Sequence, residues 1–571
     1  MSPWVIVAII GLYFLVLIGI SFFTGKDDSN EAFFMGNRKS PWYVVSFGMI
    51  GASLSGVTFI SVPGWVATSQ FSYMQMVLGY LVGYLVIAFV LLPIYYRINL
   101  TSIYGYLNER FGQKSYKTGA AYFLISRTIG ASFRLFLVAM VLQLAVFEPL
   151  GLEVPFAAPV ILTVLLIWVY TFRAGIKTII WTDTLQTLFM LLAVFFTIYM
   201  IGAELNWSIG DIVSQVKNSK YSQVWFFDDA NDKRFFWKQF LAGAFITITM
   251  TGLDQDMMQK NLSCKNLKEA QKNMLWFSAV LMFVNLVFLS LGALLYLFAQ
   301  QKGIALPEKA DELFPMLAVG GYLSVGVTIF FVLGLVAAAY SSADSALTAL
   351  TTSFCVDFLG FENQKDVSKQ KIIRRWVHVG FSVLLVVVIL IFKTINNQSV
   401  IAELFTVAGY TYGPLLGMFA FGIFHKVKVK ELYVPIVCVA APLLSYALKL
   451  NSEELFNGYI IGFELLIFNG LLTYLGFWII TKKGDEKVPE TMTGLQKIRL
   501  IESTIDKLIR PTLNRDGGDI ELIDVIDNRV KVRLTGACAS CMSSKMTLNN
   551  FVTEKLREKV APDLVVEESV L

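Results

Sequence analysis

The chain has 571 residues, of which 56% are hydrophobic and only 16% are charged. Soluble globular proteins are about 45–50% apolar and about 25% charged, so this composition excludes a cytosolic enzyme, a secreted disulfide scaffold and a disordered regulator. The formal net charge of +5 is small for this length and gives no electrostatic basis for binding nucleic acid, and we therefore expect a polytopic membrane protein.

Apolar stretches long enough to cross a bilayer follow one another through most of the chain. A spanning helix needs about 20 apolar residues. The sequence predicts about thirteen such helices, near residues 4–23, 44–68, 76–97, 119–147, 157–172, 178–203, 237–253, 274–299, 318–355, 374–393, 400–424, 433–449 and 458–481. No basic segment precedes the first of them, so we expect a retained helix and not a cleaved signal peptide.

Lysine and arginine gather in alternate loops. Cations follow the odd-numbered helices, for example Arg38 and Lys39 after the first and Lys260 and Lys265 after the seventh, whereas residues 69–75 carry no charge. Because short cytoplasmic loops carry an excess of Lys and Arg, we expect the N-terminus outside and the C-terminus in the cytoplasm. The chain would then lie in the plasma (inner) membrane of a bacterium, with the lipid bilayer as a partner.

The second expected helix is rich in residues that interrupt helices. It contains Gly48, Gly51, Gly56, Pro63 and Gly64. Such a stretch permits an unwound segment, whose freed carbonyls need a cavity or an ion at membrane depth. The alternative is a close contact between helices through small residues. In the same part of the chain, we consider Thr58 and Gln75 candidates to line a cavity, with helix contacts as the alternative; Thr251 is a third such candidate.

Ionisable residues occur within the fourth and sixth expected helices. Arg127 and Arg134 are seven positions apart and therefore share one helical face. A buried arginine needs an anion, which could be a solute carboxylate or an acid of the protein. Asp183 is a functional candidate because charge inside a membrane span is costly, although it could instead pair with Arg173 or Lys177.

The ninth expected helix contains the adjacent hydroxyls Ser341 and Ser342, followed by Asp344. Paired hydroxyls and backbone carbonyls suit Na⁺, which prefers oxygen ligands. Serines also commonly bond the carbonyls of their own helix, which would give this pair a purely structural role.

The composition changes after Ile480. Residues 481–494 are expected to be a polar linker between a membrane domain, residues 1–480, and a soluble domain, residues 495–571. Helical and then alternating periodicity predicts an α+β unit. Its expected elements are a helix over Leu495–Ile509, a turn at Arg515–Gly518, strands at Ile520–Val525 and Arg529–Leu534, and a helix near Ser543–Lys559.

Four stretches of the membrane domain carry a family resemblance. They are Thr101–Gly112, with Gly105 in place of an acid, Tyr170–Gln186, Asp254–Asn266 and Ala338–Ser342. In this order they resemble the signatures of the sodium/solute symporter family, which includes sodium-coupled carriers of glucose, proline, iodide, vitamins and sialic acid. The resemblance implies an all-α, LeuT-like core of ten helices in two inverted five-helix repeats, formed by expected helices two to six and seven to eleven.

The same resemblance implies a sodium site and a route for the ion. The implied ligands are the carbonyls of Gly51, Leu54 and Ala338 and the hydroxyls of Ser341 and Ser342. Asp183 resembles an acid on the sodium exit route. Because proline carriers have an aspartate where this chain has Ser53, the ion here would be held by neutral oxygens, which suits weak and reversible binding.

The resemblance bears on the solute through the fourth helix. In sialic acid carriers of this family, an arginine in the equivalent helix holds the substrate carboxylate, and Arg127 and Arg134 lie about one turn to either side of that position. An anionic substrate held by Arg134 is therefore a hypothesis, with an arginine–acid pair as the alternative. Sugar transport is disfavoured because the region around Gln75 lacks the acid of hexose carriers.

The soluble domain contains a Cys-x-x-Cys pair, Cys538 and Cys541. Such a pair can be a redox couple, half of a zinc site or half of an iron–sulfur site. Residues Ile509–Leu513, Asp516–Asp519 and Gly536–Leu548 resemble the C-terminal domain of NifU-type iron–sulfur scaffolds, with Met542 in place of proline. The resemblance implies a [4Fe–4S] cluster that bridges a homodimer, and a degenerate domain kept for dimerisation is the alternative.

The sequence thus predicts a transporter and not an enzyme. In the leading interpretation, Na⁺ moving down its gradient drives import of a small organic solute by alternating access. A membrane-tethered iron–sulfur scaffold, or a solute or redox sensor, each with a carrier domain that does not transport, are the alternatives.

Overall fold

The computed structural model of the chain forms two compact units, Met1–Lys483 and Gly484–Leu571. We call them the membrane unit and the C-terminal unit and describe each by itself. The structure describes residues 3–24, 29–98, 100–148, 150–171, 175–361, 366–395, 400–481, 494–515, 517–526, 528–536, 551–560 and 564–569.

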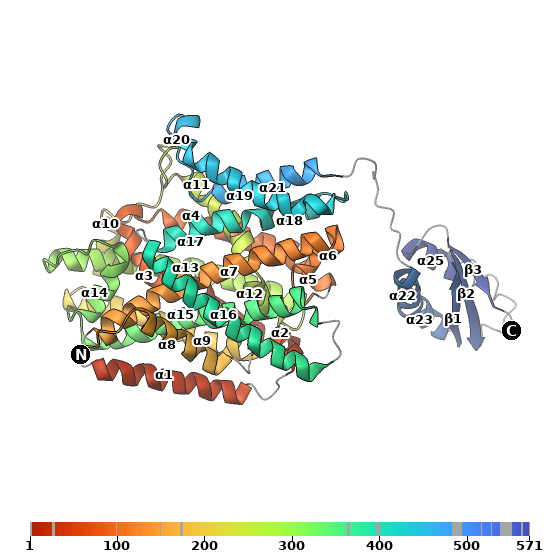
Figure 1. Ribbon diagram of the computed structural model, residues 1–571, viewed down its shortest axis with the longest axis horizontal. Helices are drawn as coiled ribbons and strands as arrows, with labels where there is room; N and C mark the ends of the chain where they lie inside the picture. The colour runs from red at the N-terminus through yellow and green to blue at the C-terminus, as the bar shows by residue number, and fades with distance from the viewer. Residues whose placement is uncertain are drawn as a thin grey trace. The chain divides into compact units, whose positions relative to one another are not determined.

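The membrane unit is a bundle of α-helices (Figure 1). Its longer helices are α1 (Pro3–Thr24), α3 (Trp42–Ser69), α4 (Tyr73–Val86), α7 (Gln113–Leu142), α8 (Ala157–Thr171), α9 (Gly175–Glu204), α11 (Phe236–Thr247), α13 (Leu267–Gln301), α15 (Val325–Ser353), α16 (Val367–Ile395), α17 (Val400–Thr411), α18 (Gly413–Phe424), α19 (Val434–Leu450) and α21 (Leu465–Ile479). Its shorter helices are α2 (Asn30–Met35), α5 (Leu92–Ile98), α6 (Gly105–Phe111), α10 (Ile209–Asn218), α12 (Gln255–Leu262), α14 (Leu313–Val319) and α20 (Ser452–Leu455). Single π-helical turns extend α4, α7, α11 and α15 as η2 (Ile87–Leu91), η3 (Gln143–Phe147), η4 (Ile248–Gly252) and η6 (Phe354–Phe358).

Each of the thirteen expected spans contains a helix, but the count itself is not confirmed. Within the described residues, 9 helices are long and apolar enough to cross a membrane, or 10 if α17 and α18, which meet at a bend of 44°, form one span. Two further apolar helices, Ala157–Val169 and Leu465–Ile479, are shorter than this criterion requires. The count of about thirteen therefore stays a prediction.

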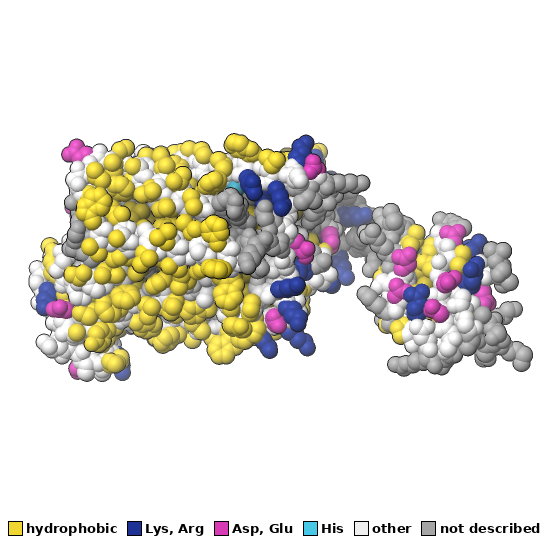
Figure 2. Space-filling view, turned by 90° about the horizontal axis from the view of Figure 1, so that it is seen from below, with side chains coloured by type: hydrophobic (Ala, Val, Ile, Leu, Met, Phe, Trp, Pro, Cys, Tyr) yellow, Lys and Arg dark blue, Asp and Glu magenta, His cyan; other side chains and the backbone are white. Residues whose placement is uncertain are grey.

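The ends of the bundle alternate as consecutive spans require. Figure 1 shows α2, α5 and α6 at one end of the membrane unit and α10, α14 and α20 at the opposite end. In Figure 2, a broad belt of hydrophobic side chains covers the face between these ends. A surface of this kind is typical of a protein whose solvent is lipid. Which end faces the cytoplasm stays a prediction from the distribution of Lys and Arg.

Two helices of the bundle are interrupted. Ser55 has a φ of 46° and a ψ of 171°, which breaks α3 inside the glycine-rich stretch; a residue with a side chain rarely adopts a positive φ. A second break separates η4 from α12, where the Asp254 carboxylate accepts hydrogen bonds from the Asp256 and Met257 amides. The prediction that Lys260 is a loop cation is wrong, because Lys260 is buried on α12.

The interrupted helix α3 lies in the interior, in contact with α9, α13 and α15. Gly51 permits its close approach to α9: a Cβ atom at Gly51 would lie 2.2 Å from Thr187 Oγ1, whose oxygen accepts a hydrogen bond from the Gly51 amide at 3.0 Å. Thr187 thus leaves little room for a side chain at this position, and the stretch serves both as a break and as a close helix contact.

The C-terminal unit combines helices with a three-stranded sheet. Its elements are α22 (Gly494–Thr504), η9 (Ile505–Ile509), α23 (Arg510–Arg515), β1 (Gly518–Ile526), β2 (Arg529–Gly536), α25 (Thr553–Lys559) and β3 (Val565–Glu568). β1 and β2, the two strands that the alternating pattern predicted, pair antiparallel, and β3 adds to β2 in parallel. β3 is not predicted from the sequence, because a four-residue strand has too short a pattern to be recognised before its partner is known.

Candidate functional site

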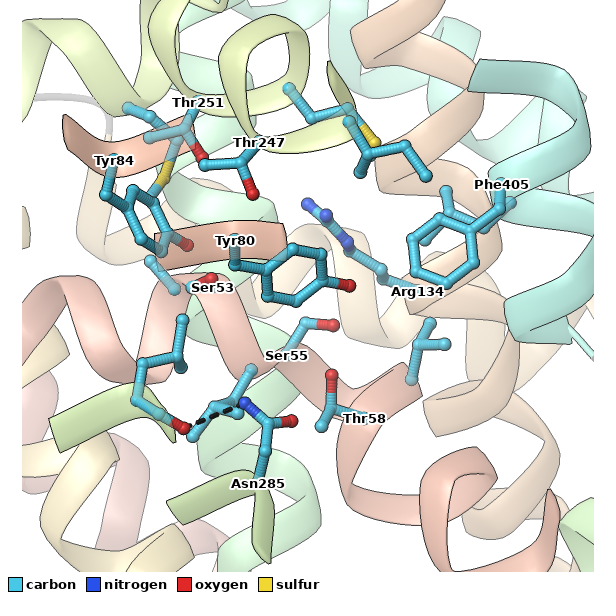
Figure 3. Close-up of a pocket in the computed structure, with 18 of the residues that line it drawn as sticks. Ser53, Ser55, Thr58, Tyr80, Tyr84, Arg134, Thr247, Thr251, Asn285 and Phe405 are labelled. Carbon is cyan, nitrogen blue, oxygen red and sulfur yellow. Dashed lines mark hydrogen bonds between the residues drawn. The ribbon is translucent and has the colours of Figure 1, made fainter. Parts of the chain in front are cut away.

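A cavity with an accessible volume of about 80 Å³ lies where the two interrupted helices meet (Figure 3). α3 and the α11–η4–α12 segment line it together with α4, α7, α13 and α17. Its labelled lining residues are Ser53, Ser55, Thr58, Tyr80, Tyr84, Arg134, Thr247, Thr251, Asn285 and Phe405. The breaks thus place irregular backbone beside a polar cavity, where it can be satisfied at membrane depth.

The two arginines of α7 have different surroundings. Arg127 forms an ion pair with Asp256 of α12, and both side chains are buried. Arg134 is only 7% exposed and points into the cavity (Figure 3), and its Nε and Nη1 atoms have no hydrogen-bond partner among the described residues. A pair between arginine and acid therefore accounts for Arg127, whereas Arg134 remains able to bind an anion inside the cavity.

Hydroxyl and amide groups surround this guanidinium. The hydroxyls of Tyr73 and Tyr80 lie 3.0 Å apart, and Tyr84 lines the cavity together with Ser53, Thr247 and Thr251 (Figure 3). Asn285 donates to the Leu281 carbonyl at 2.9 Å, while its Oδ1 atom has no partner among the described residues. The cavity thus offers donors to an anionic group at Arg134 and an acceptor at Asn285 to a hydroxyl or amine of the same solute.

Three of the four residues expected to line a cavity do so, namely Thr58, Arg134 and Thr251. Gln75 lies elsewhere: its amide donates to the Arg234 carbonyl at 2.7 Å, and its Oε1 atom accepts from the Phe226 amide at 3.2 Å. Gln75 therefore fastens the start of α4 to the loop before α11.

Three tyrosines of the cavity, Tyr73, Tyr80 and Tyr84, are not among the lining residues predicted from the sequence. Their spacing of seven and four positions lies on one helical face, and this pattern could have indicated that face. Asn285 stood alone in an apolar helix, so no comparable pattern marked it.

The implied sodium ligands lie on two helices that are in contact, α3 and α15. The Ser342 hydroxyl is 3.4 Å from the Ala52 carbonyl, between Gly51 and Leu54 along α3, and 3.3 Å from the Ala338 carbonyl of its own helix. The Ser342 hydroxyl thus contacts a carbonyl of its own helix and also a carbonyl of α3. Ser341 instead donates to Asp183 Oδ1 at 2.5 Å.

Asp183 is fully buried on α9 and pairs with Lys260, whose Nζ lies 2.7 Å from Asp183 Oδ2. This partner was not among those considered from the sequence. Arg173 lies outside the described residues, and the side chain of Lys177 is not described. Asp183 therefore joins the Ser341–Ser342 pair of α15 to the buried cation of α12.

In the C-terminal unit, Cys538 and Cys541 lie outside the described residues. Within the described part of the chain, no group of three or more His, Cys, Asp or Glu side chains could hold a metal ion. Arg510 fastens α23 to β1 through Asp519 Oδ1 at 2.8 Å and the Ile520 carbonyl at 2.9 Å. The Ile520 amide and Arg510 hold the pKa of Asp519 below its ordinary value.

Comparisons with known proteins agree with this division. Residues 33–431 match the sodium:solute symporter family, and residues 501–567 match the NifU-like domain. The sodium/sialic acid symporter NanT of Aliivibrio fischeri is 25% identical over 473 residues, which cover 80% of this chain and 90% of that protein. The nitrogen fixation protein NifU of Leptolyngbya boryana is 46% identical over 89 residues, which cover 16% of this chain and 43% of that protein.

A solved structure shows the same fold. The substrate-bound, outward-open state of a Na⁺-coupled sialic acid symporter has a TM-score of 0.70 at 18% identity, over 84% of this chain and 99% of that chain. The membrane unit therefore has the LeuT-like transporter fold.

The different surroundings of the two arginines lead to a stability prediction. Arg127→Ala leaves Asp256 as an unpaired buried charge and should lower the free energy of unfolding by about 3–5 kcal/mol. Arg134→Ala removes a buried charge that forms no ion pair with the described residues, and should leave the stability unchanged or raise it. Thermal unfolding of the detergent-solubilised proteins, without solute, measures both effects. Equal destabilisation by the two variants would show that Arg134 has a structural partner.

Proposed function

The chain belongs to the sodium:solute symporter family, and we propose that it is a sodium-coupled secondary transporter that imports a small organic anion by alternating access. The observation that carries the choice of an anion is the buried guanidinium of Arg134, which points into the cavity without a protein partner among the described residues. A buried arginine is costly unless an anion pairs with it, and a carboxylate supplies that pair in bidentate geometry. The sialic acid named for the relative NanT is also a carboxylate.

The coupling ion in this proposal is Na⁺, bound where α3 and α15 meet. The proposed ligands are the carbonyls of Gly51, Leu54 and Ala338 and the hydroxyls of Ser341 and Ser342. The 3.4 Å approach of the Ser342 hydroxyl to the Ala52 carbonyl supports this assignment, because it brings oxygens of both helices together. Neutral oxygens favour reversible binding, and Asp183, bonded to Ser341, is the proposed acid of the exit route.

An ion at this position acts by joining two helices. Bound Na⁺ would draw the α3 carbonyls and the α15 hydroxyls into one coordination shell, which stabilises α3 next to its break at Ser55. Since Ser53, Ser55 and Thr58 of α3 line the cavity, fixing this segment also orders one wall of the solute site. This supplies a differential contact through which the ion favours the solute-binding conformation.

The orientation and the C-terminal unit belong to the same proposal. We place the C-terminal unit in the cytoplasm of a bacterium. It follows an odd-numbered expected helix, as the Lys- and Arg-rich loops do, and loops rich in Lys and Arg are typically cytoplasmic. The match of residues 501–567 to the NifU-like domain supports binding of a [4Fe–4S] cluster by Cys538 and Cys541. Two cysteines supply half of the four thiolates such a cluster needs, so the cluster would join two chains as a homodimer.

Sodium dependence is the first test. In proteoliposomes, uptake of a carboxylate identified by thermal-shift screening should stop when choline replaces sodium. Ser342→Ala should raise the sodium concentration for half-maximal uptake about tenfold, since a lost ligand of about 1–1.5 kcal/mol corresponds to that factor. Ser290→Ala, whose hydroxyl bonds the Leu286 carbonyl of its own helix, is the matched control. Uptake that is the same in choline would favour the scaffold or sensor interpretations.

Arg134 is tested by the same uptake. Arg134→Ala should abolish carboxylate uptake while the amount of protein in the membrane stays unchanged. Arg134→Lys should retain a weak activity, because a lysine keeps the charge but not the planar pair of donors. Transport by Arg134→Ala at the rate of the unchanged protein would exclude this residue as the anion ligand.

The cluster is tested independently of transport. Anaerobic reconstitution with iron and sulfide should give the purified protein the broad visible absorption of an iron–sulfur cluster. Cys538→Ser and Cys541→Ser should stay colourless, whereas Cys438→Ser, which changes a buried free cysteine of the membrane unit, should colour normally. A colourless unchanged protein would favour a degenerate domain kept for dimerisation.

A further inference from the structure

The short helix α12 carries two buried charges of opposite sign. Asp256 and Lys260 are four residues apart and therefore neighbours on one side of the helix. Both are only 1% exposed, and α12 packs against α3, α9, α13 and α15. Helix α12, eight residues long, is thus embedded between the cavity and the candidate sodium ligands. Asp256 forms its ion pair on the cavity side, and Lys260 forms its ion pair on the side of the sodium ligands.

The acidic end of α12 is paired at the cavity. Asp256 forms its ion pair with Arg127, which lines the cavity on the same face of α7 as Arg134. An anion bound at Arg134 would also lie in the field of Arg127. It would therefore compete with Asp256 for Arg127 and weaken that ion pair.

The basic end of α12 is paired at the sodium ligands. Lys260 Nζ lies 2.7 Å from Asp183 Oδ2, and Ser341 donates to the other oxygen of the same carboxylate at 2.5 Å. A cation beside Ser341 and Ser342 would compete with Lys260 for Asp183. Each proposed occupant therefore loosens one of the two ion pairs that hold α12.

We propose that Asp256 and Lys260 are positioning residues through which α12 couples the anion at Arg134 to Na⁺ at Ser342. This inference rests on the proposed function, because it presupposes both occupants. With both sites empty, α12 is clamped to α7 and α9 by buried ion pairs that are costly to break singly. Either occupant opens one clamp, so the second binds more readily, and the coupling is reciprocal.

Another contact of the same segment provides a control. The Tyr412 hydroxyl donates to Asp254 Oδ2 at 2.6 Å, just before α12. Tyr412→Phe removes a buried hydrogen bond from this segment and leaves both ion pairs intact. It therefore separates loss of coupling from general loosening of α12.

The test uses sodium alone and needs no identified solute. Thermal stabilisation of the full-length protein in detergent is titrated with sodium chloride, with choline chloride keeping the ionic strength constant. Asp256→Asn imitates the anion-bound state by opening the clamp at Arg127, and should lower the sodium concentration for half-maximal stabilisation at least about threefold, within the usual range of coupling effects. Asp256→Glu, which keeps the carboxylate, and Tyr412→Phe should both retain the value of the unchanged protein.

A double variant controls for misfolding caused by an unpaired buried charge. Arg127→Gln combined with Asp256→Asn removes both charges and leaves no unpaired ion, and it should show the same threefold shift. An unchanged or raised half-maximal concentration in Asp256→Asn and in this double variant, or an equal shift in Tyr412→Phe, overturns the role of α12. If sodium does not stabilise even the unchanged protein, both the proposed function and this inference fail. If sodium stabilises the unchanged protein but the variants give the contrary results above, only this inference fails.

Discussion

The membrane unit is governed by the rule that hydrocarbon offers no hydrogen bonds to a polar group. Backbone that leaves the helical path must therefore be enclosed by protein or face a cavity. Both breaks obey this rule: Ser55 lines the cavity, and the segment after η4 is capped by the side chain of Asp254. The cavity thus lies where two interrupted helices come together, and residues of both segments line it.

The same rule governs the buried charges. Asp256 is matched by Arg127 and Asp183 by Lys260, so that four ionisable groups are removed from lipid as two pairs. Buried pairs contribute little net stability, but breaking one leaves a costly unpaired charge. Because α12 supplies one member of each pair, it is fixed to α7 and α9 at once. Arg134, which has no such partner among the described residues, is the position where a bound anion gains most.

Close packing completes this arrangement. Small residues let α3 lie deep in the bundle, in contact with α9 and α15, and Gly51 against Thr187 of α9 is the clearest case. Small residues at helix contacts are the usual means of close approach in membranes, where lipid provides no hydrophobic force between helices. The glycines of this helix therefore serve the break at Ser55 and the contacts on either side of it together.

The sequence by itself indicated which segments are apolar enough to lie in a membrane, which stretch of the second helix could be interrupted, and where the C-terminal unit has two of its strands. These properties depend on local composition and periodicity, which each segment carries without reference to the others. Only the tertiary structure decided that Arg127, and not Arg134, pairs with an acid among the described residues, that Lys260 is buried against Asp183, and that Gln75 fastens a loop instead of lining the cavity. Each of these depends on a partner more than 75 residues away along the chain. The seven-residue spacing of Arg127 and Arg134 puts them on one face of α7, but which of them meets an acid depends on where α12 packs.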